Sequence, residues 1–117
     1  MIKKIKIGLI QSKSLGTIQS NINLAIKNIK KAAKKKAKII CLPELFLSNY
    51  FCQTESHSNF KLAEKIPGTT SRIFCDLAKE LGVVLNITMF EKKTSGFYHN
   101  TSIIINENGN ILSNYRK

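Results

Sequence analysis

The sequence lacks the segments that would place a protein in a membrane or send it out of the cell. No stretch approaches the roughly 18 consecutive apolar residues of a transmembrane helix. The opening MIKKIKIGLIQSKS lacks the uninterrupted apolar region of about 7–15 residues that a signal peptide needs, because Lys4 and Lys6 interrupt it. Repeats and low-complexity linkers are absent as well. We therefore expect a cytoplasmic protein without membrane contact, whose residues 1–117 form one domain or less.

Cysteine and histidine are both few. The three cysteines, Cys41, Cys52 and Cys75, are an odd number without CxxC or metal-site spacing, which favours reduced thiols in a cytosolic protein. Cys41 lies in an expected strand and Cys75 in an expected helix, so both are expected in the core. His57 and His99 are isolated. We therefore expect neither a metal nor another cofactor.

Acidic residues are also scarce, because 7 Asp and Glu face 19 Lys and Arg, which gives a net charge of +12. Such a charge is typical of nucleic-acid-binding modules, and that function is one alternative for the chain. However, 17 of the basic residues are Lys and only 2 are Arg, whereas proteins that read bases and phosphates favour Arg. The abundance of Lys, Ile and Asn is what an AT-rich coding sequence supplies. We therefore favour a solvated basic surface and do not expect a nucleic-acid partner.

The hydrophobic pattern predicts alternating strands and helices. The continuous apolar run 38–42 is typical of a buried parallel strand, and the segment 46–68 after it is longer than ordinary connections, with a short helical turn at 59–65. This order predicts an α/β fold, with helices beside a sheet and chemistry at the carboxyl ends of its strands. The expected elements are strand 3–11, helix 17–36, strand 38–42, helix 69–81, strand 83–90, turn 92–96, strand 98–105 and strand 111–116.

The helix expected at 17–36 has one apolar side and one basic side. Thr17 or Ser20 can cap its start. Lysines cover the solvent side of its C-terminal half, where they complement the negative end of the helix dipole. The buried side is expected to comprise Ile18, Ile22, Ala25, Ile26, Ile29 and Ala33.

Glu44 follows the apolar strand that begins at Ile39 and is the most informative residue of the chain. A carboxylate at the end of a buried strand is costly to desolvate. Burial would raise the pKa of Glu44 and make it a candidate general base. The alternative is a strand-end side chain that points into water or serves a structural ion pair.

Four segments of the sequence form a recognisable pattern: IKIGLIQ near the start, ICLPELFLSNYF around Glu44, LAKELGVVLNITMFEK, and YHNTSIIINENGNILSNYRK at the end. In this order and spacing they resemble the N-terminal half of the nitrilase superfamily, the carbon–nitrogen hydrolases. NYFCQ and AKELGVVLNITMFEK look most like the N-carbamoylputrescine amidases, with N-carbamoyl amino-acid amidases and ω-amidases as close relatives. The resemblance implies hydrolysis of a small amide or carbamoyl substrate, such as N-carbamoylputrescine in polyamine biosynthesis, without a cofactor.

The resemblance also implies roles for particular residues. The Glu of LPELF is Glu44, the implied general base, and the Lys of YRK is Lys117, the implied stabiliser of an oxyanion. Tyr50, Phe51 and Asn100 are the implied substrate-pocket candidates, and Asn100 is also implied to order the loop near Glu44. The family's nucleophilic Cys belongs to a strand-to-helix elbow that matches no residue of this sequence. The chain alone is therefore expected to be inactive.

Each of these roles has a simpler alternative. At the last position of the sequence Lys117 would ordinarily be a frayed, solvated side chain, and only its YRK context favours a catalytic role. Tyr50 and Phe51 could simply pack within the loop, and Asn100 could make a plain polar contact between turn and strand. Cys52, in a loop beside aromatic residues, is the cysteine best suited to be a reactive thiol. We do not expect it to replace the missing nucleophile.

The resemblance further implies that the fold of residues 1–117 is incomplete. The family domain is more than twice as long and forms a four-layer α-β-β-α sandwich, in which each sheet takes strands from both halves of the chain. One face of the sheet formed here should therefore lack its partner, which is an association liability. We therefore expect one of three situations: a truncated or frameshifted gene product, half of a split enzyme, or a fragment that associates with a full-length relative as a non-catalytic partner. Its expected protein partner is a second copy or the missing C-terminal half.

Overall fold

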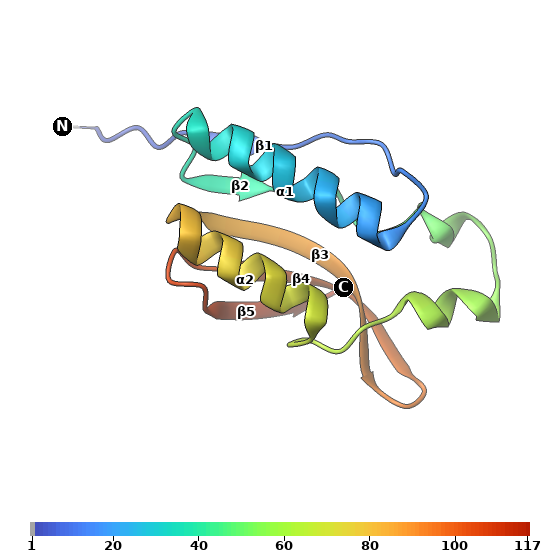
Figure 1. Ribbon diagram of the computed structural model, residues 1–117. Coiled ribbons are helices and arrows are strands. Elements are labelled where there is room, and N and C mark those ends of the chain that lie inside the picture. The colour runs from blue at the N-terminus through green and yellow to red at the C-terminus, as the bar shows by residue number, and fades with distance from the viewer. Residues whose placement is uncertain (1) are drawn as a thin grey trace.

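Five strands pair in the order in which they occur in the sequence, β1-β2-β3-β4-β5. The computed structural model describes residues 2–117 (Figure 1). The strands are β1 (Ile7–Leu9), β2 (Ile39–Cys41), β3 (Val84–Thr94), β4 (Phe97–Ile105) and β5 (Ile111–Arg116). The helices are α1 (Ile18–Lys34) and α2 (Thr69–Leu81), with the short 3-10 helices η1 (Phe51–Gln53) and η2 (His57–Leu62) between β2 and α2.

The sheet is half parallel and half antiparallel. Strands β1, β2 and β3 pair in parallel, whereas β3, β4 and β5 pair antiparallel through two hairpins. The connections β1-α1-β2 and β2-α2-β3 step in the same direction across the sheet, so right-handed crossovers place both helices on the same face. Figure 1 shows α1 and α2 side by side on that face. The predicted α/β class is confirmed.

Local signals in the sequence correctly predicted where several helices and strands begin or end. The Thr17 hydroxyl accepts the Ser20 backbone N–H at 3.1 Å and so caps the start of α1. Gly82 ends α2 in the left-handed conformation, with φ 64°, which a side chain would disfavour. The predicted bounds of helix 69–81 and strand 111–116 are the observed bounds of α2 and β5.

Other predicted bounds were wrong where pairing partners decide them. Strand β1 is limited to Ile7–Leu9 instead of 3–11, because its neighbour β2 offers only three residues for pairing. Strand β3 runs on to Thr94, so the turn expected at 92–96 is shorter. Beyond the end of β2, the backbone of Glu64 pairs with β3 through hydrogen bonds of 2.9 and 2.8 Å. The helical turn in this connection, η2, also begins two residues earlier than the expected 59–65.

The core lies between the two helices and one face of the sheet. Leu85, Ile87 and Met89 alternate along β3 and are at most 1% exposed, and Ile29 of α1 and Phe74 of α2 cover them with no exposed surface. The prediction that Ile18 is buried was wrong, because this side chain is 37% exposed. Ile18 is the first residue of α1, and the buried stripe begins one turn later, at Ile22.

Within residues 2–117, no layer covers the other face of the sheet. On β1 the side chains of Ile7 and Leu9 are 57% and 80% exposed, and Tyr115 of β5 is 69% exposed. Both helices pack on the opposite face (Figure 1). The sheet therefore has the half-covered arrangement that the sequence led us to expect.

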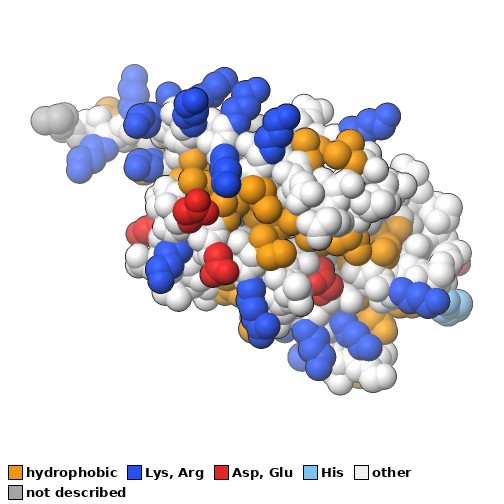
Figure 2. All heavy atoms as spheres, viewed as in Figure 1, with side chains coloured by type: hydrophobic (Ala, Val, Ile, Leu, Met, Phe, Trp, Pro, Cys, Tyr) orange, Lys and Arg blue, Asp and Glu red, His pale blue; other side chains and the backbone are white. Residues whose placement is uncertain are grey.

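Basic side chains are spread along the helical side of the molecule. Figure 2 shows many Lys and Arg side chains at the upper edge, where α1 and the N-terminal segment lie, with apolar side chains between the two helices. Within residues 2–117, no helix is both long and apolar enough to cross a bilayer.

Candidate active site

Glu44 lies in a tight turn directly after β2, at the carboxyl end of the parallel strands. The next residue, Leu45, has a positive φ of 50°, which is uncommon for a side chain of this size. The Leu45 backbone N–H donates to the hydroxyl of Thr88 on β3 at 2.8 Å. Thr88 thereby fixes the bend that turns Glu44 away from the strand direction.

The rest of this turn is anchored in the core. Leu45, Phe46 and Leu47 are each at most 8% exposed, and the Phe46 ring meets Phe74 of α2 edge to face at 5.4 Å. The buried Asn21 of α1 donates its side-chain amide to the Leu47 carbonyl at 2.9 Å. The buried residues Leu45, Phe46 and Leu47 therefore anchor the backbone that follows Glu44 in the core. The Glu44 carboxylate itself lies outside the core.

Glu44, Asn100 and Lys117 meet at one oxygen atom. The Lys117 Nζ lies 2.7 Å from Glu44 Oε1, and the Asn100 side-chain amide donates to the same oxygen at 2.7 Å. The Lys117 backbone N–H donates to the Asn100 carbonyl at 2.9 Å. The structure therefore brings together three residues that the sequence had singled out, although they are separated by 56 and 73 positions from Glu44.

The electrostatics of this cluster differ from the sequence prediction. The hydrogen bond from Lys117, followed by that from Asn100, holds the pKa of Glu44 below its usual value, and the slight burial of the carboxyl does not offset this. The hydrogen bond to Glu44 in turn raises the pKa of Lys117. The side chains of Glu44 and Lys117 are 39% and 67% exposed. The prediction that burial raises the pKa of Glu44 was therefore wrong, because the face on which it lies is uncovered.

An open cavity of about 320 Å³ contains the cluster on the uncovered face of the sheet. Thr88, Ser102 and Tyr115 lie side by side across β3, β4 and β5 and form its floor. Glu44, Asn100 and Lys117 border this floor, together with Leu42. The cavity therefore combines an apolar and hydroxyl-bearing surface with one carboxylate and one ammonium group.

Tyr50 and Phe51 lie in different places. Tyr50 shares a smaller hollow of about 160 Å³ with Glu44. Phe51 instead packs against Phe90, with ring centroids 4.8 Å apart, and lines a separate hollow of about 500 Å³ with Cys52. The structure thus brings Tyr50 next to Glu44, whereas Phe51 and Cys52 line a neighbouring hollow.

All three cysteines are free thiols. Cys52 is exposed, whereas Cys41 and Cys75 are only half-buried. Burial, with a smaller effect of Asp76, raises the pKa of the Cys75 thiol. The expectation of core positions is met in part, since Cys75 packs against the buried cluster without being enclosed by it. Within residues 2–117, no three His, Cys, Asp or Glu side chains gather as metal ligands would.

Sequence reasoning missed Thr88, Ser102 and Tyr115 in this cavity. The alternation of apolar and polar residues along 84–90 was a usable signal, because it places Asn86 and Thr88 on the face opposite Leu85 and Ile87. No local signal in the sequence indicates which of these polar residues lies next to Glu44.

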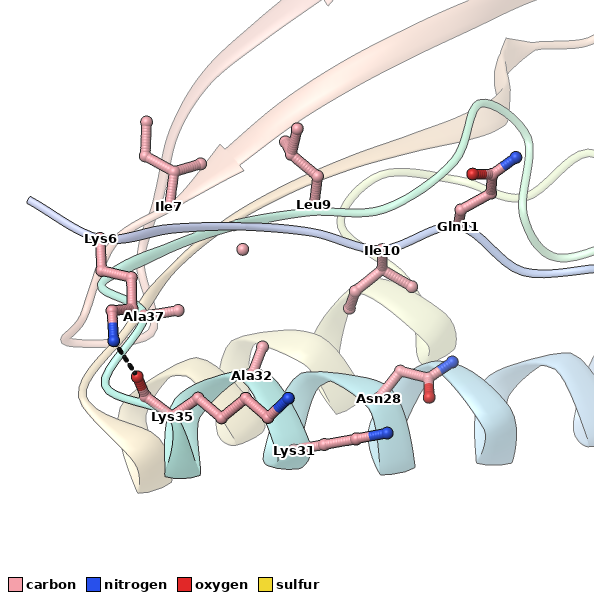
Figure 3. Close-up of a pocket in the computed structure, with 11 residues that line it drawn as sticks. Lys6, Ile7, Leu9, Ile10, Gln11, Asn28, Lys31, Ala32, Lys35 and Ala37 are labelled. Carbon is pink, nitrogen blue, oxygen red and sulfur yellow. Dashed lines mark hydrogen bonds between the residues drawn. The ribbon is translucent and has the colours of Figure 1, made fainter.

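A further hollow, of about 330 Å³, lies between the edge strand β1 and α1 (Figure 3). It opens beside Gly8, which has no side chain to fill it. Its polar residues are amides and lysines, and Lys6 donates to the Lys35 carbonyl at 3.0 Å. It has no acid, thiol or hydroxyl group among its lining residues, so it offers no general base or nucleophile.

The sheet, the two helices on one face, and a carboxylate–lysine pair at the carboxyl end of β2 define an α/β protein of the nitrilase type. A family model described as carbon-nitrogen hydrolase matches residues 6–117. The chain belongs to the carbon-nitrogen hydrolase family, as its sequence motifs predicted.

Curated relatives and a solved structure agree with this assignment. The chain is 35% identical to an omega-amidase from Xenopus laevis and to an N-carbamoylputrescine amidase from Oryza sativa subsp. japonica, with 97% of the chain aligned in both cases. A crystal structure of a carbon-nitrogen hydrolase from Helicobacter pylori G27 has 33% identity, a TM-score of 0.91 and 97% coverage of the chain. The chain spans 40%, 38% and 39% of the length of these three proteins.

Proposed function

We propose that this chain contributes the general base and the oxyanion-stabilising cation of a carbon–nitrogen hydrolase that acts on a small amide or carbamoyl compound. The observation that carries the proposal is the 2.7 Å contact between Glu44 and Lys117 inside an open cavity of about 320 Å³. The lowered pKa of Glu44 keeps its carboxyl group ionised near neutral pH, which is the form that can accept a proton. The raised pKa of Lys117 keeps its ammonium charged.

The nucleophile in this proposal is a cysteine thiol from a segment that is not part of residues 1–117. Glu44 takes the thiol proton, and the sulfur attacks the carbonyl carbon of the substrate. The carbonyl oxygen becomes an oxyanion, which the Lys117 ammonium stabilises. Collapse of this intermediate expels ammonia or an amine, which takes the proton held by Glu44, and leaves an acyl-enzyme. Glu44 then activates water to release the acid.

Coverage of the open face would complete the proposed site. The second layer of the sandwich, from a C-terminal half or another chain, would exclude water from the cavity around Glu44. Desolvation opposes ionisation of a carboxyl group, so the pKa of Glu44 would rise toward the range useful for a general base.

For the substrate we propose N-carbamoylputrescine, whose hydrolysis gives putrescine, carbon dioxide and ammonia in polyamine biosynthesis in the cytoplasm. The relative from Oryza sativa bears the name of that activity and is 35% identical over 115 residues. The omega-amidase from Xenopus laevis is equally similar. An ω-amide is therefore the second substrate to test.

The experiment joins this chain to a C-terminal half. Residues 1–117 are mixed with the separately produced C-terminal half of a related carbon–nitrogen hydrolase that carries its cysteine, and ammonia release from N-carbamoylputrescine and from an ω-amide is measured. We expect no turnover from either half alone and turnover from the mixture. Ammonia from N-carbamoylputrescine but not from the ω-amide would select the first substrate.

Variants connect the activity to the proposed residues. Glu44→Gln and Lys117→Met should each lower the turnover of the mixture by about 100-fold or more, since each removes a group that acts in the transition state. The matched control is Lys93→Met, which removes an exposed lysine of β3 outside the cavity. Robust turnover by residues 1–117 alone would overturn the assignment of the nucleophile to another segment. A mixture that forms a complex but hydrolyses neither substrate would overturn the proposed reaction.

A further inference from the structure

A second ion pair lies on the helical face of the sheet, on the other side from Glu44. Glu91 of β3 is 2% exposed and accepts two hydrogen bonds from the Arg116 guanidinium, at 2.7 and 2.9 Å. The Thr101 hydroxyl of β4 donates to the same carboxylate at 2.7 Å. Three adjacent strands therefore converge on one buried carboxylate, and this fork-like pairing fixes the direction of the guanidinium.

The position of this pair matters because Arg116 directly precedes Lys117. Successive side chains of a strand point to opposite faces of the sheet. When Arg116 is held against Glu91 on the helical face, the next residue is directed to the open face, where Lys117 meets Glu44. The Lys117 backbone N–H bonds to the Asn100 carbonyl and continues the β4–β5 ladder by one residue.

Strand β5 has few other restraints near its end. It is an edge strand, and its residues from Leu112 to Arg116 are exposed. Within the described residues, Arg116 is the β5 residue whose side chain hydrogen-bonds to another strand. Without this anchor only backbone hydrogen bonds to β4 would define where the strand ends and where Lys117 points.

We propose that the Glu91–Arg116 pair is the anchor that positions Lys117 against Glu44. Glu91 and Arg116 are positioning residues in this scheme, since neither lines the cavity around Glu44. The relevance of the anchor to catalysis rests on the function proposed above. The geometric claim, that the pair sets the Glu44–Lys117 contact, stands apart from that function.

The test measures the Glu44–Lys117 contact directly in the full 117-residue chain. The pKa of the Glu44 carboxyl is followed by NMR in carboxyl-labelled protein, in wild type and in the double variant Glu91→Gln/Arg116→Met. This double variant removes both charges, so it leaves no unpaired buried charge and keeps the net charge of the protein unchanged. The expected result is a rise of the Glu44 pKa toward its ordinary value, as in Lys117→Met. In the Lys117→Met background the double variant should cause no further rise.

Two comparisons separate positioning from general damage. Asn114→Ala changes an exposed side chain of the same strand and should leave the Glu44 pKa unchanged. Arg116→Lys keeps the charge but not the forked geometry, and should give a Glu44 pKa between those of wild type and the double variant. An unchanged Glu44 pKa in a double variant with a native-like amide spectrum would overturn the proposal. If the double variant does not fold, the Glu44 pKa is measured in Arg116→Lys instead. A Glu44 pKa equal to that of wild type in this variant overturns the proposal.

The amidase activity of the mixed halves tests the proposed function separately from the geometric claim. The anchor variants should lower kcat by on the order of 100-fold through misplacement of Lys117, with KM little changed. A mixture without amidase activity in which the Glu44 pKa still responds to the anchor variants would reject the proposed function and leave the anchor standing. An active mixture in which the anchor variants leave the Glu44 pKa unchanged would support the proposed function and reject the anchor.

Discussion

The side-chain amide of Asn100 donates to the same oxygen of Glu44 that accepts the Lys117 ammonium, with both contacts at 2.7 Å. Through its backbone carbonyl, Asn100 also accepts the Lys117 N–H at 2.9 Å. One residue of β4 therefore orients both members of the pair. This arrangement predicts how the carboxylate responds when the two donors are removed one at a time.

Replacing Asn100 by Ala should raise the pKa of Glu44 by less than replacing Lys117 by Met, because the lysine hydrogen bond is the largest cause of the lowered value. The backbone bond to Lys117 does not depend on the Asn100 side chain, so the ion pair should persist. An NMR titration of the Glu44 carboxyl measures both effects. Ser102→Ala, in the same cavity but without a bond to Glu44, is the control. An Asn100→Ala titration identical to wild type would contradict the geometry.

A second prediction concerns the acid stability that Glu91 provides. The hydrogen bond from Arg116 holds the pKa of Glu91 below its usual value, against the effect of burial, and Thr101 adds to it. A carboxyl whose pKa is lower in the folded than in the unfolded chain stabilises the fold above the unfolded pKa of about 4.3. That contribution is lost as the pH falls through the folded value. Acidification from about pH 6 to pH 3 should therefore lower the free energy of unfolding less in Glu91→Gln than in wild type.

Urea unfolding at the two pH values tests this dependence. At pH 6 we expect Glu91→Gln to be less stable than wild type by about 2–3 kcal/mol, because a buried charged hydrogen-bond network is broken. Glu107→Gln, in the exposed β4–β5 turn, should match wild type at both pH values. Equal losses on acidification in wild type and Glu91→Gln would show that Glu91 titrates alike in the folded and unfolded chain.

The sequence predicted best those features that neighbouring residues determine. Helix α2 depends on apolar spacing within one segment and on Gly82 at its end, and its bounds were predicted correctly. The length of β1 depends on how many residues β2 offers for pairing, and its prediction failed. Tertiary pairing decides such bounds and leaves no mark within the segment itself.

In the candidate site too, local features were predicted correctly and features that depend on distant residues were not. Glu44 stood out because it follows a buried strand, and Lys117 only through its resemblance to a family motif. The environment of Glu44 was predicted wrongly, because within residues 2–117 nothing covers the face on which it lies, and its pKa depends on a lysine 73 positions away. Glu91 was missed for a similar reason, since Arg116 is 25 positions distant.

The turn that carries Glu44 gives a third prediction, through Thr88. Thr88→Val keeps the shape of the side chain but leaves the Leu45 N–H without its 2.8 Å acceptor. Loss of that bond should destabilise the fold by about 1–2 kcal/mol and weaken the Glu44–Lys117 contact. Thr88→Ser retains the hydroxyl and should stay close to wild type. Urea unfolding and the Glu44 titration measure the two effects, and equal behaviour of the Val and Ser variants would argue against this role.

The last prediction concerns the uncovered face of the sheet. Ile7 and Leu9 of β1 are 57% and 80% exposed there, and an apolar face of this kind promotes association. Sedimentation velocity should show concentration-dependent association of the chain, and the double variant Ile7→Ser/Leu9→Ser should reduce it. Because these side chains are mostly exposed already, the expected loss of stability is only about 0.5 kcal/mol for each. Leu15→Ser removes an equally exposed leucine outside the sheet and should leave association unchanged. A wild-type chain that remains monomeric at every concentration tested would contradict this use of the open face.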